Sequence, residues 1–93
     1  MTLAIYEKLL CDAKKSRLSR KIDDSRPYIL MGLSEDGAIS FESYKTREEG
    51  IARARERWVE QNYQAVDAFH VFNEKIVIDY HALRLNFENK KEK

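Results

Sequence analysis

Apolar residues recur along this chain with two different periods, one typical of helices and one typical of strands. In the first twenty residues the spacing is three or four, which places the apolar side chains on one face of a helix. These side chains are Leu3, Tyr6, Leu9, Leu10 and Ala13. Basic residues follow, where cations complement the negative end of a helix dipole. The pattern predicts a helix from Thr2 to near Arg20, and a linker at Asp23–Pro27.

Two apolar segments, residues 28–33 and 38–43, flank a polar turn that ends in Gly37 and predict a β-hairpin. A three-residue loop with a left-handed glycine sets Leu33 opposite Ile39 and Met31 opposite Phe41. One face then carries Ile29, Met31, Leu33, Ile39 and Phe41. A four-residue loop would instead gather Tyr28, Leu30, Ile39 and Phe41, and the sequence leaves that alternative open.

A second helix is predicted to begin at Thr46, because Glu49 follows three residues later as in a capping box. Its predicted buried stripe is Ile51, Ala54, Trp58 and Val59. Asn62 is the expected stop. Gly50 lies inside this helix, where glycine costs about 1 kcal/mol relative to alanine. It indicates either a close approach to a strand or a residue that is simply tolerated.

A second hairpin is predicted at residues 66–72 and 75–80, with Asn73 and Glu74 as a two-residue loop. This register places Phe69, Val71, Ile76 and Ile78 on the face expected to be core, and His70, Phe72, Val77 and Asp79 on the other. The expected fold is therefore α+β: an N-terminal helix followed by ββαββ, with a four-stranded, mainly antiparallel sheet. The second helix is expected on one face and the first on the sheet or its edge, with strand order open.

Size and composition limit the class of protein. A chain of 93 residues suits one domain, expected at residues 1–88, with residues 89–93 as a frayed polar tail. Hydrophobic residues make up 43% and charged residues 35%, which indicates a soluble globule. No apolar run approaches the roughly 18 residues of a membrane span, so no membrane partner is expected. The single cysteine, Cys11, favours the cytoplasm, since small secreted domains usually carry paired cysteines.

Candidate catalytic chemistry is sparse in the sequence. Cys11 lies at the edge of the first helix's apolar stripe, where packing is the expected role. His70, Asp79 and His81 could share the outer sheet face as metal ligands, but mixed polar neighbours are ordinary on a solvated face. Zinc-binding, phosphate-binding and dinucleotide-binding motifs are absent from the sequence. We therefore expect no enzyme, no catalytic residues, no metal and no cofactor.

Protein binding is the leading functional hypothesis. Leu83, Leu85 and Phe87 alternate near the end of the sequence, and such a segment needs a surface to bury against. They are the expected partner-binding residues, which would add to the sheet edge of a partner or of a second copy. The alternative is that they close over the domain's own core as a fifth strand. The hypothesis is a non-catalytic module, a small regulator or inhibitor that docks on a larger protein assembly, with a homodimer as the other arrangement.

Nucleic-acid binding is the alternative, from a different class. Net charge is only +1, but residues 1–21 hold six basic and two acidic groups, whereas residues 22–45 hold two basic and five acidic. The basic segment 14–26 could contact phosphates through Lys14, Lys15, Arg17, Arg20, Lys21 and Arg26. A basic helix end facing its own dipole explains the same residues without a ligand.

Overall fold

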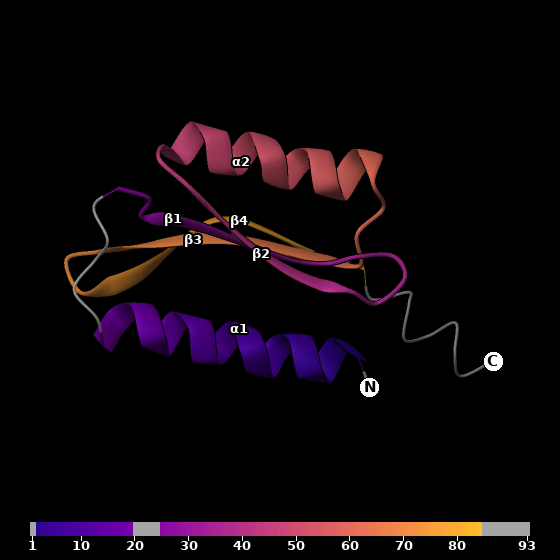
Figure 1. Ribbon diagram of the computed structural model, residues 1–93, viewed down its shortest axis with the longest axis horizontal. Helices are drawn as coiled ribbons and strands as arrows, with labels where there is room; N and C mark the ends of the chain where they lie inside the picture. Colours follow the sequence, from indigo (N-terminus) through magenta and orange to yellow (C-terminus); the bar gives the residue numbers. More distant parts are fainter. Residues whose placement is uncertain (1, 20–24, 85–93) are drawn as a thin grey trace.

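Four antiparallel strands form one sheet with a helix on each face (Figure 1). The computed structural model describes residues 2–19 and 25–84. Its elements are α1 (Thr2–Ser19), β1 (Tyr28–Leu33), β2 (Ile39–Tyr44), α2 (Arg47–Arg55), a π-helical turn η1 (Glu56–Glu60), β3 (Ala65–Phe72) and β4 (Lys75–Leu83). The strand order is β2-β1-β3-β4. The α+β prediction is confirmed, and the predicted tail at 89–93 lies outside the described residues.

The first hairpin has the three-residue loop. Leu33 pairs with Ile39 and Met31 with Phe41, as that loop predicts. Gly37 has a φ of 95°, a conformation that glycine adopts without steric cost. The Ser34 amide donates to the Ala38 carbonyl at 2.8 Å, which closes the loop. The four-residue alternative is thereby excluded.

The two central strands, β1 and β3, are buried on both faces, and this explains why two hairpin registers were compatible with the sequence. Side chains from the α1 face form one core cluster: Tyr6, Leu10, Met31, Leu33, Ala65 and Phe69. Those from the α2 face form the other: Leu30, Ala54, Val66 and Ala68, with Tyr44, Trp58, Tyr63 and Tyr80 packed against them. A strand that is buried on both faces is apolar throughout and carries no clear two-residue alternation.

Helix α1 is held to the sheet by a polar contact within an apolar layer. The Tyr6 hydroxyl lies 2.7 Å from Oδ2 of Asp67 and 3.0 Å from the Met31 carbonyl oxygen. His81 Nδ1 lies 2.5 Å from the other Asp67 oxygen. Burial and the negative charge of Asp67 raise the pKa of Tyr6 far above its ordinary value, so its hydroxyl stays protonated. Asp67 is only 2% exposed, and these two side chains provide its hydrogen bonds.

Helix α2 begins at the predicted residue, since the Thr46 hydroxyl accepts from the Glu49 amide at 3.2 Å. Gly50 and Ala54 are its buried residues, and Trp58 in η1 is half-buried. The prediction that Val59 belongs to the buried stripe is wrong, because Val59 is 68% exposed. The wider π-helical turn changes the angle between successive side chains and so alters which of them face the sheet.

The end of η1 is fixed to the end of β4 by Arg84. Its guanidinium lies over the Trp58 ring, 4.1 Å from the centroid, and donates to the Trp58 carbonyl at 2.8 Å and the Tyr63 carbonyl at 3.0 Å. Helix-terminal carbonyls lack partners within the helix, so the bond to Trp58 satisfies a group that would otherwise be orphaned. Asn62 follows in the left-handed conformation with a φ of 54°, which confirms it as the predicted stop.

The two helices cover the sheet unequally. Helix α1 contacts β1, β3 and β4, whereas α2 contacts all four strands. Phe41 of the edge strand β2 is consequently 52% exposed on the α1 face. Ile78 of the other edge strand is 46% exposed, so the prediction that it belongs to the core is wrong, while Phe69 in the same set is fully buried.

The glycines give a paired test of the packing. A Cβ at Gly50 would meet Tyr44 and Tyr28 at ordinary contact distances of 3.8 and 3.9 Å, whereas one at Gly32 would lie 2.6 Å from the Tyr63 ring. We expect Gly50→Ala to raise the free energy of unfolding by about 1 kcal/mol. We expect Gly32→Ala to lower it by about 1–3 kcal/mol, because the tyrosine must move. Urea denaturation measures both, and a stabilised Gly32→Ala would contradict this packing.

The buried carboxylate gives a second test. Tyr6→Phe removes the hydroxyl that donates to Asp67 and keeps the ring, so we expect a loss of about 1–3 kcal/mol in the free energy of unfolding. Tyr80→Phe is the matched control, since the Tyr80 hydroxyl has no hydrogen-bond partner among residues 2–19 and 25–84. Equal effects of the two substitutions in thermal or urea unfolding would show that the Tyr6–Asp67 bond does not anchor α1.

Candidate functional site

Strand β2 presents one row of its backbone groups away from the sheet. Residues that face each other in an antiparallel pair alternate between hydrogen-bonded and non-hydrogen-bonded pairs. The Ser34–Ala38 bond fixes the phase of this alternation, so Ser40 and Glu42 bond to β1. The N–H and C=O groups of Ile39, Phe41 and Ser43 therefore point outward. The Arg26 guanidinium donates to the Ser43 carbonyl at 3.3 Å, in agreement with this orientation.

The side of this edge that faces α1 is apolar. Ile39 packs against the α1-face cluster, and Phe41, two residues further, shares its face. Because α1 lies over the other three strands, the Phe41 ring is left half exposed beside the outward backbone groups. An extended segment laid along β2 would cover this ring with its own side chains.

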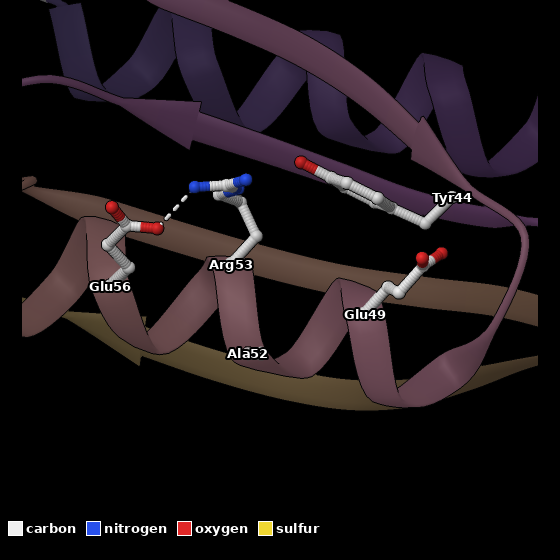
Figure 2. A pocket seen from close by; sticks show the side chains of 5 residues that line it. All are labelled: Tyr44, Glu49, Ala52, Arg53 and Glu56. Atoms are coloured by element: carbon white, nitrogen blue, oxygen red, sulfur yellow. Dashed lines mark hydrogen bonds and ion pairs between the residues drawn. The ribbon is translucent and has the colours of Figure 1, made fainter.

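The side of the edge that faces α2 is hollowed and polar (Figure 2). The hollow has a volume of about 290 Å³ and is lined by Tyr44, Glu49, Ala52, Arg53 and Glu56. Figure 2 shows the Tyr44 ring extending from the strand toward Arg53, which forms an ion pair with Glu56. The lining of the hollow joins Tyr44, the last residue of β2, to residues of α2 and the first residue of η1.

Glu42 organises the strand side of the hollow. Its carboxylate accepts from the Tyr44 hydroxyl at 2.5 Å and from the Arg57 guanidinium at 2.5 and 3.0 Å. Burial raises the pKa of Glu42, but the bonds from Tyr44 and Arg57 outweigh it and lower the pKa overall. Burial and the bond to Glu42 raise the pKa of Tyr44 to about 12. Tyr44 and Arg57 are thus held in place, and Tyr44 forms the strand side of the hollow.

The other sheet edge, β4, is less regular. The register of β3 and β4 shifts between Ala68 and Phe69, which marks a β-bulge. Bulges twist an edge strand and interrupt the row of free backbone groups, so they hinder the addition of another strand. The β2 edge is regularly paired to β1 over all six of its residues and lacks such an interruption. Of the two edges, β2 is the better template for strand addition.

The predicted partner-binding residues are only partly within the described chain. Leu83 is the last residue of β4, pairs with Ala65 and packs against the α1-face cluster. Leu85 and Phe87 lie outside the described residues. Their role in partner binding stays a prediction.

The predicted nucleic-acid-binding residues cluster at the end of α1 and at the start of β1. The Arg17 guanidinium donates to the carbonyls of Arg26 and Pro27, and Arg26 donates to Ser43. The Lys14 ammonium lies 5.9 Å from the centroid of the Phe69 ring, while Lys15 is exposed. Arg20 and Lys21 lie outside the described residues. Three of these cations thus have structural contacts, and phosphate binding stays a prediction.

The three candidate metal ligands do not share a face. His70 Nδ1 lies 2.7 Å from Asp79, which also accepts from Arg47 at 2.8 Å, whereas His81 bonds to Asp67 on the α1 face. The bulge adds a residue to β4 and so reverses the facing of His81, which corrects the expectation that all three lie together. Among the described residues, His, Cys, Asp and Glu form no group of three that could hold a metal.

Cys11 is exposed on α1, so the expectation of a packing role at the edge of the apolar stripe is wrong. The stripe continues from Leu10 to Ala13, and Cys11 lies about 100° around the helix from Leu10, away from the sheet. The described residues also contain no helix long and apolar enough to cross a membrane.

Sequence reasoning did not identify the β2 edge as a site. A usable signal was present in the composition, because residues 28–33 are apolar on both faces whereas residues 39–44 contain two serines and a glutamate. Central strands covered on both faces are continuously apolar, and edge strands are more polar.

Comparisons with protein-family models, with curated proteins and with solved structures find no match to this chain. The geometry described above is therefore the basis for the functional proposal.

The Glu42 network predicts a pH dependence of stability. A carboxyl group whose pKa is lowered by folding stabilises the protein fully above its ordinary pKa, here 4.5, and loses that contribution as pH falls through the lowered value. We expect the free energy of unfolding to fall in this acidic range, and Glu42→Gln to make the fall shallower. Glu74→Gln, in the exposed β3–β4 turn, is the control. Identical acid profiles for wild type and Glu42→Gln, measured by urea denaturation at each pH, would contradict the proposed network.

Proposed function

We propose that the protein is a non-catalytic, cytoplasmic protein-binding module, a small regulator or inhibitor that docks on a larger assembly. Docking occurs by addition of an extended partner segment to the β2 edge. The observation that carries this proposal is the outward row of N–H and C=O groups at Ile39, Phe41 and Ser43, flanked by an exposed aromatic ring and an open hollow. Strand addition is a recurring mode of peptide recognition that uses such an edge.

The two flanks give the edge a means of selecting its partner. Main-chain hydrogen bonds supply affinity that is largely independent of sequence, and side-chain contacts supply specificity. Successive side chains of an added strand point to opposite faces, so alternate residues would meet Phe41 and the hollow beside Tyr44. A matching segment carries an apolar residue on the Phe41 side and a polar residue on the other.

A display library of random 12-residue peptides tests the proposal directly. We expect enriched peptides to bind the wild-type protein, and Phe41→Lys to weaken their binding at least tenfold, because a charged side chain at this position removes the apolar contact and discourages strand addition. Isothermal titration calorimetry measures the affinities.

The matched control is Phe72→Lys, because Phe72 is also largely exposed, at 62%, but lies at the β3–β4 turn. It should leave peptide binding unchanged. Peptides that bind Phe41→Lys as tightly as the wild type would place the binding site elsewhere and overturn the proposal.

A further inference from the structure

We infer that the β2 edge also binds a second copy of itself, so that two chains pair antiparallel through β2 about a two-fold axis at Phe41. This inference rests on the proposed function, since it assigns a partner to the same edge. The occupant is another copy of the same six-residue strand, and the pairing joins two four-stranded sheets into one continuous sheet of eight strands.

The backbone fixes which pairings are available. Only Ile39, Phe41 and Ser43 present outward groups, so an antiparallel partner must bond through the same three residues of the second copy. An axis at Phe41 pairs Phe41 with the second copy's Phe41, and Ile39 with its Ser43. This arrangement overlaps the whole strand and uses every outward backbone group. The Ser43 carbonyl, which also accepts from Arg26 at 3.3 Å, has a second lone pair for the amide of the second copy.

Side-chain size agrees with this axis. On the α2 face it sets Ser40 opposite the second copy's Glu42, and Ala38 opposite its Tyr44. Each large side chain therefore faces a small one, and cross-strand neighbours contact without crowding. On the α1 face the two half-exposed Phe41 rings meet, which shields both from water.

The two neighbouring registers, with the axis at Glu42 or at Ser40, are less favourable. An axis at Glu42 would set two carboxylates directly opposite each other, and like charges in that position are destabilising. An axis at Ser40 would leave Ser43 and Tyr44 beyond the paired region. With the axis at Phe41, the only charge on β2 is that of Glu42, which is already paired with Arg57 and faces a serine.

The contact is small, which determines its strength. A six-residue strand pair lies below the area of standard stable interfaces, so we expect a weak dimer with a dissociation constant of roughly tens to hundreds of micromolar. A partner segment that fits the same edge better would displace the second copy. Self-association and partner binding are therefore mutually exclusive.

Sedimentation equilibrium over a range of concentrations tests the dimer. We expect wild type and the control Phe72→Lys to self-associate equally, and Phe41→Lys and Phe41→Glu each to be monomeric, because the axis brings two like charges together. Mixing these two variants should restore a heterodimer, since the axis then sets lysine opposite glutamate. Unfolding curves establish that all variants are folded before they are compared.

A mixed sample of differently isotope-labelled chains tests the register. Ser40 and the second copy's Glu42 form a non-hydrogen-bonded pair, whose α-protons are close, so we expect an intermolecular nuclear Overhauser effect between them. Any of three results would overturn the inference. They are self-association of Phe41→Lys equal to that of the wild type, a mixture of Phe41→Lys and Phe41→Glu that stays monomeric, and intermolecular contacts in a different register. If the wild type stays monomeric at millimolar concentration but binds library peptides through Phe41, the dimer alone is refuted. If it neither self-associates nor binds peptides through Phe41, the proposed function is refuted as well.

Discussion

The structure depends on the pairing of β1 with β3, two apolar strands that place side chains in a core on both faces of the sheet. Leu30 and Val66 contribute to the α2-face cluster, whereas Met31 and Phe69 contribute to the α1-face cluster. Neither face can be left to water, so both helices are required and must lie on opposite sides (Figure 1). Two helices cover the centre of a four-stranded sheet more fully than its edges, and the exposed aromatic ring of β2 follows from this geometry.

Polar contacts at a few defined points hold the layers in register. Asp67 is buried on the α1 face and bonds to Tyr6 from the helix and to His81 from the neighbouring strand. On the α2 face, Arg84 joins the end of η1 to the end of β4 through Trp58. A buried polar group is tolerated only when its partners are in place, so such contacts favour one arrangement over the many that apolar packing alone would allow.

The sequence predicted those features that depend on residues close together in the chain. The cap at Thr46 and the two-residue loop at Asn73 and Glu74 follow from local chemistry, and the structure has both. The three-residue loop with a left-handed Gly37 was one of two alternatives that the sequence left open. The second hairpin keeps its predicted register only up to the bulge beyond Phe69. Strand order was not predictable, because it depends on contacts between β1 and β3, which are far apart in sequence.

The candidate site was less accessible to prediction for the same reason. Two irregular elements each add a residue to a regular period and so change which way the following side chains point. They are the β-bulge, which puts His81 and His70 on different faces, and the π-helical turn, which exposes Val59. Periodic patterns assume regular elements, so such irregularities are invisible to them. The β2 edge became recognisable as a site only when the order of the strands placed it at the border of the sheet.

The central claim is that β2 is an edge strand whose outward backbone groups, at Ile39, Phe41 and Ser43, can pair with another strand. Residue-resolved amide hydrogen exchange on the dilute, monomeric protein tests it most directly. The account predicts slow exchange at Ser40 and Glu42, whose amides bond to β1, and fast exchange at Ile39 and Phe41, whose amides point outward. Uniformly slow exchange at all four residues would mean that the edge is already covered and would contradict the account.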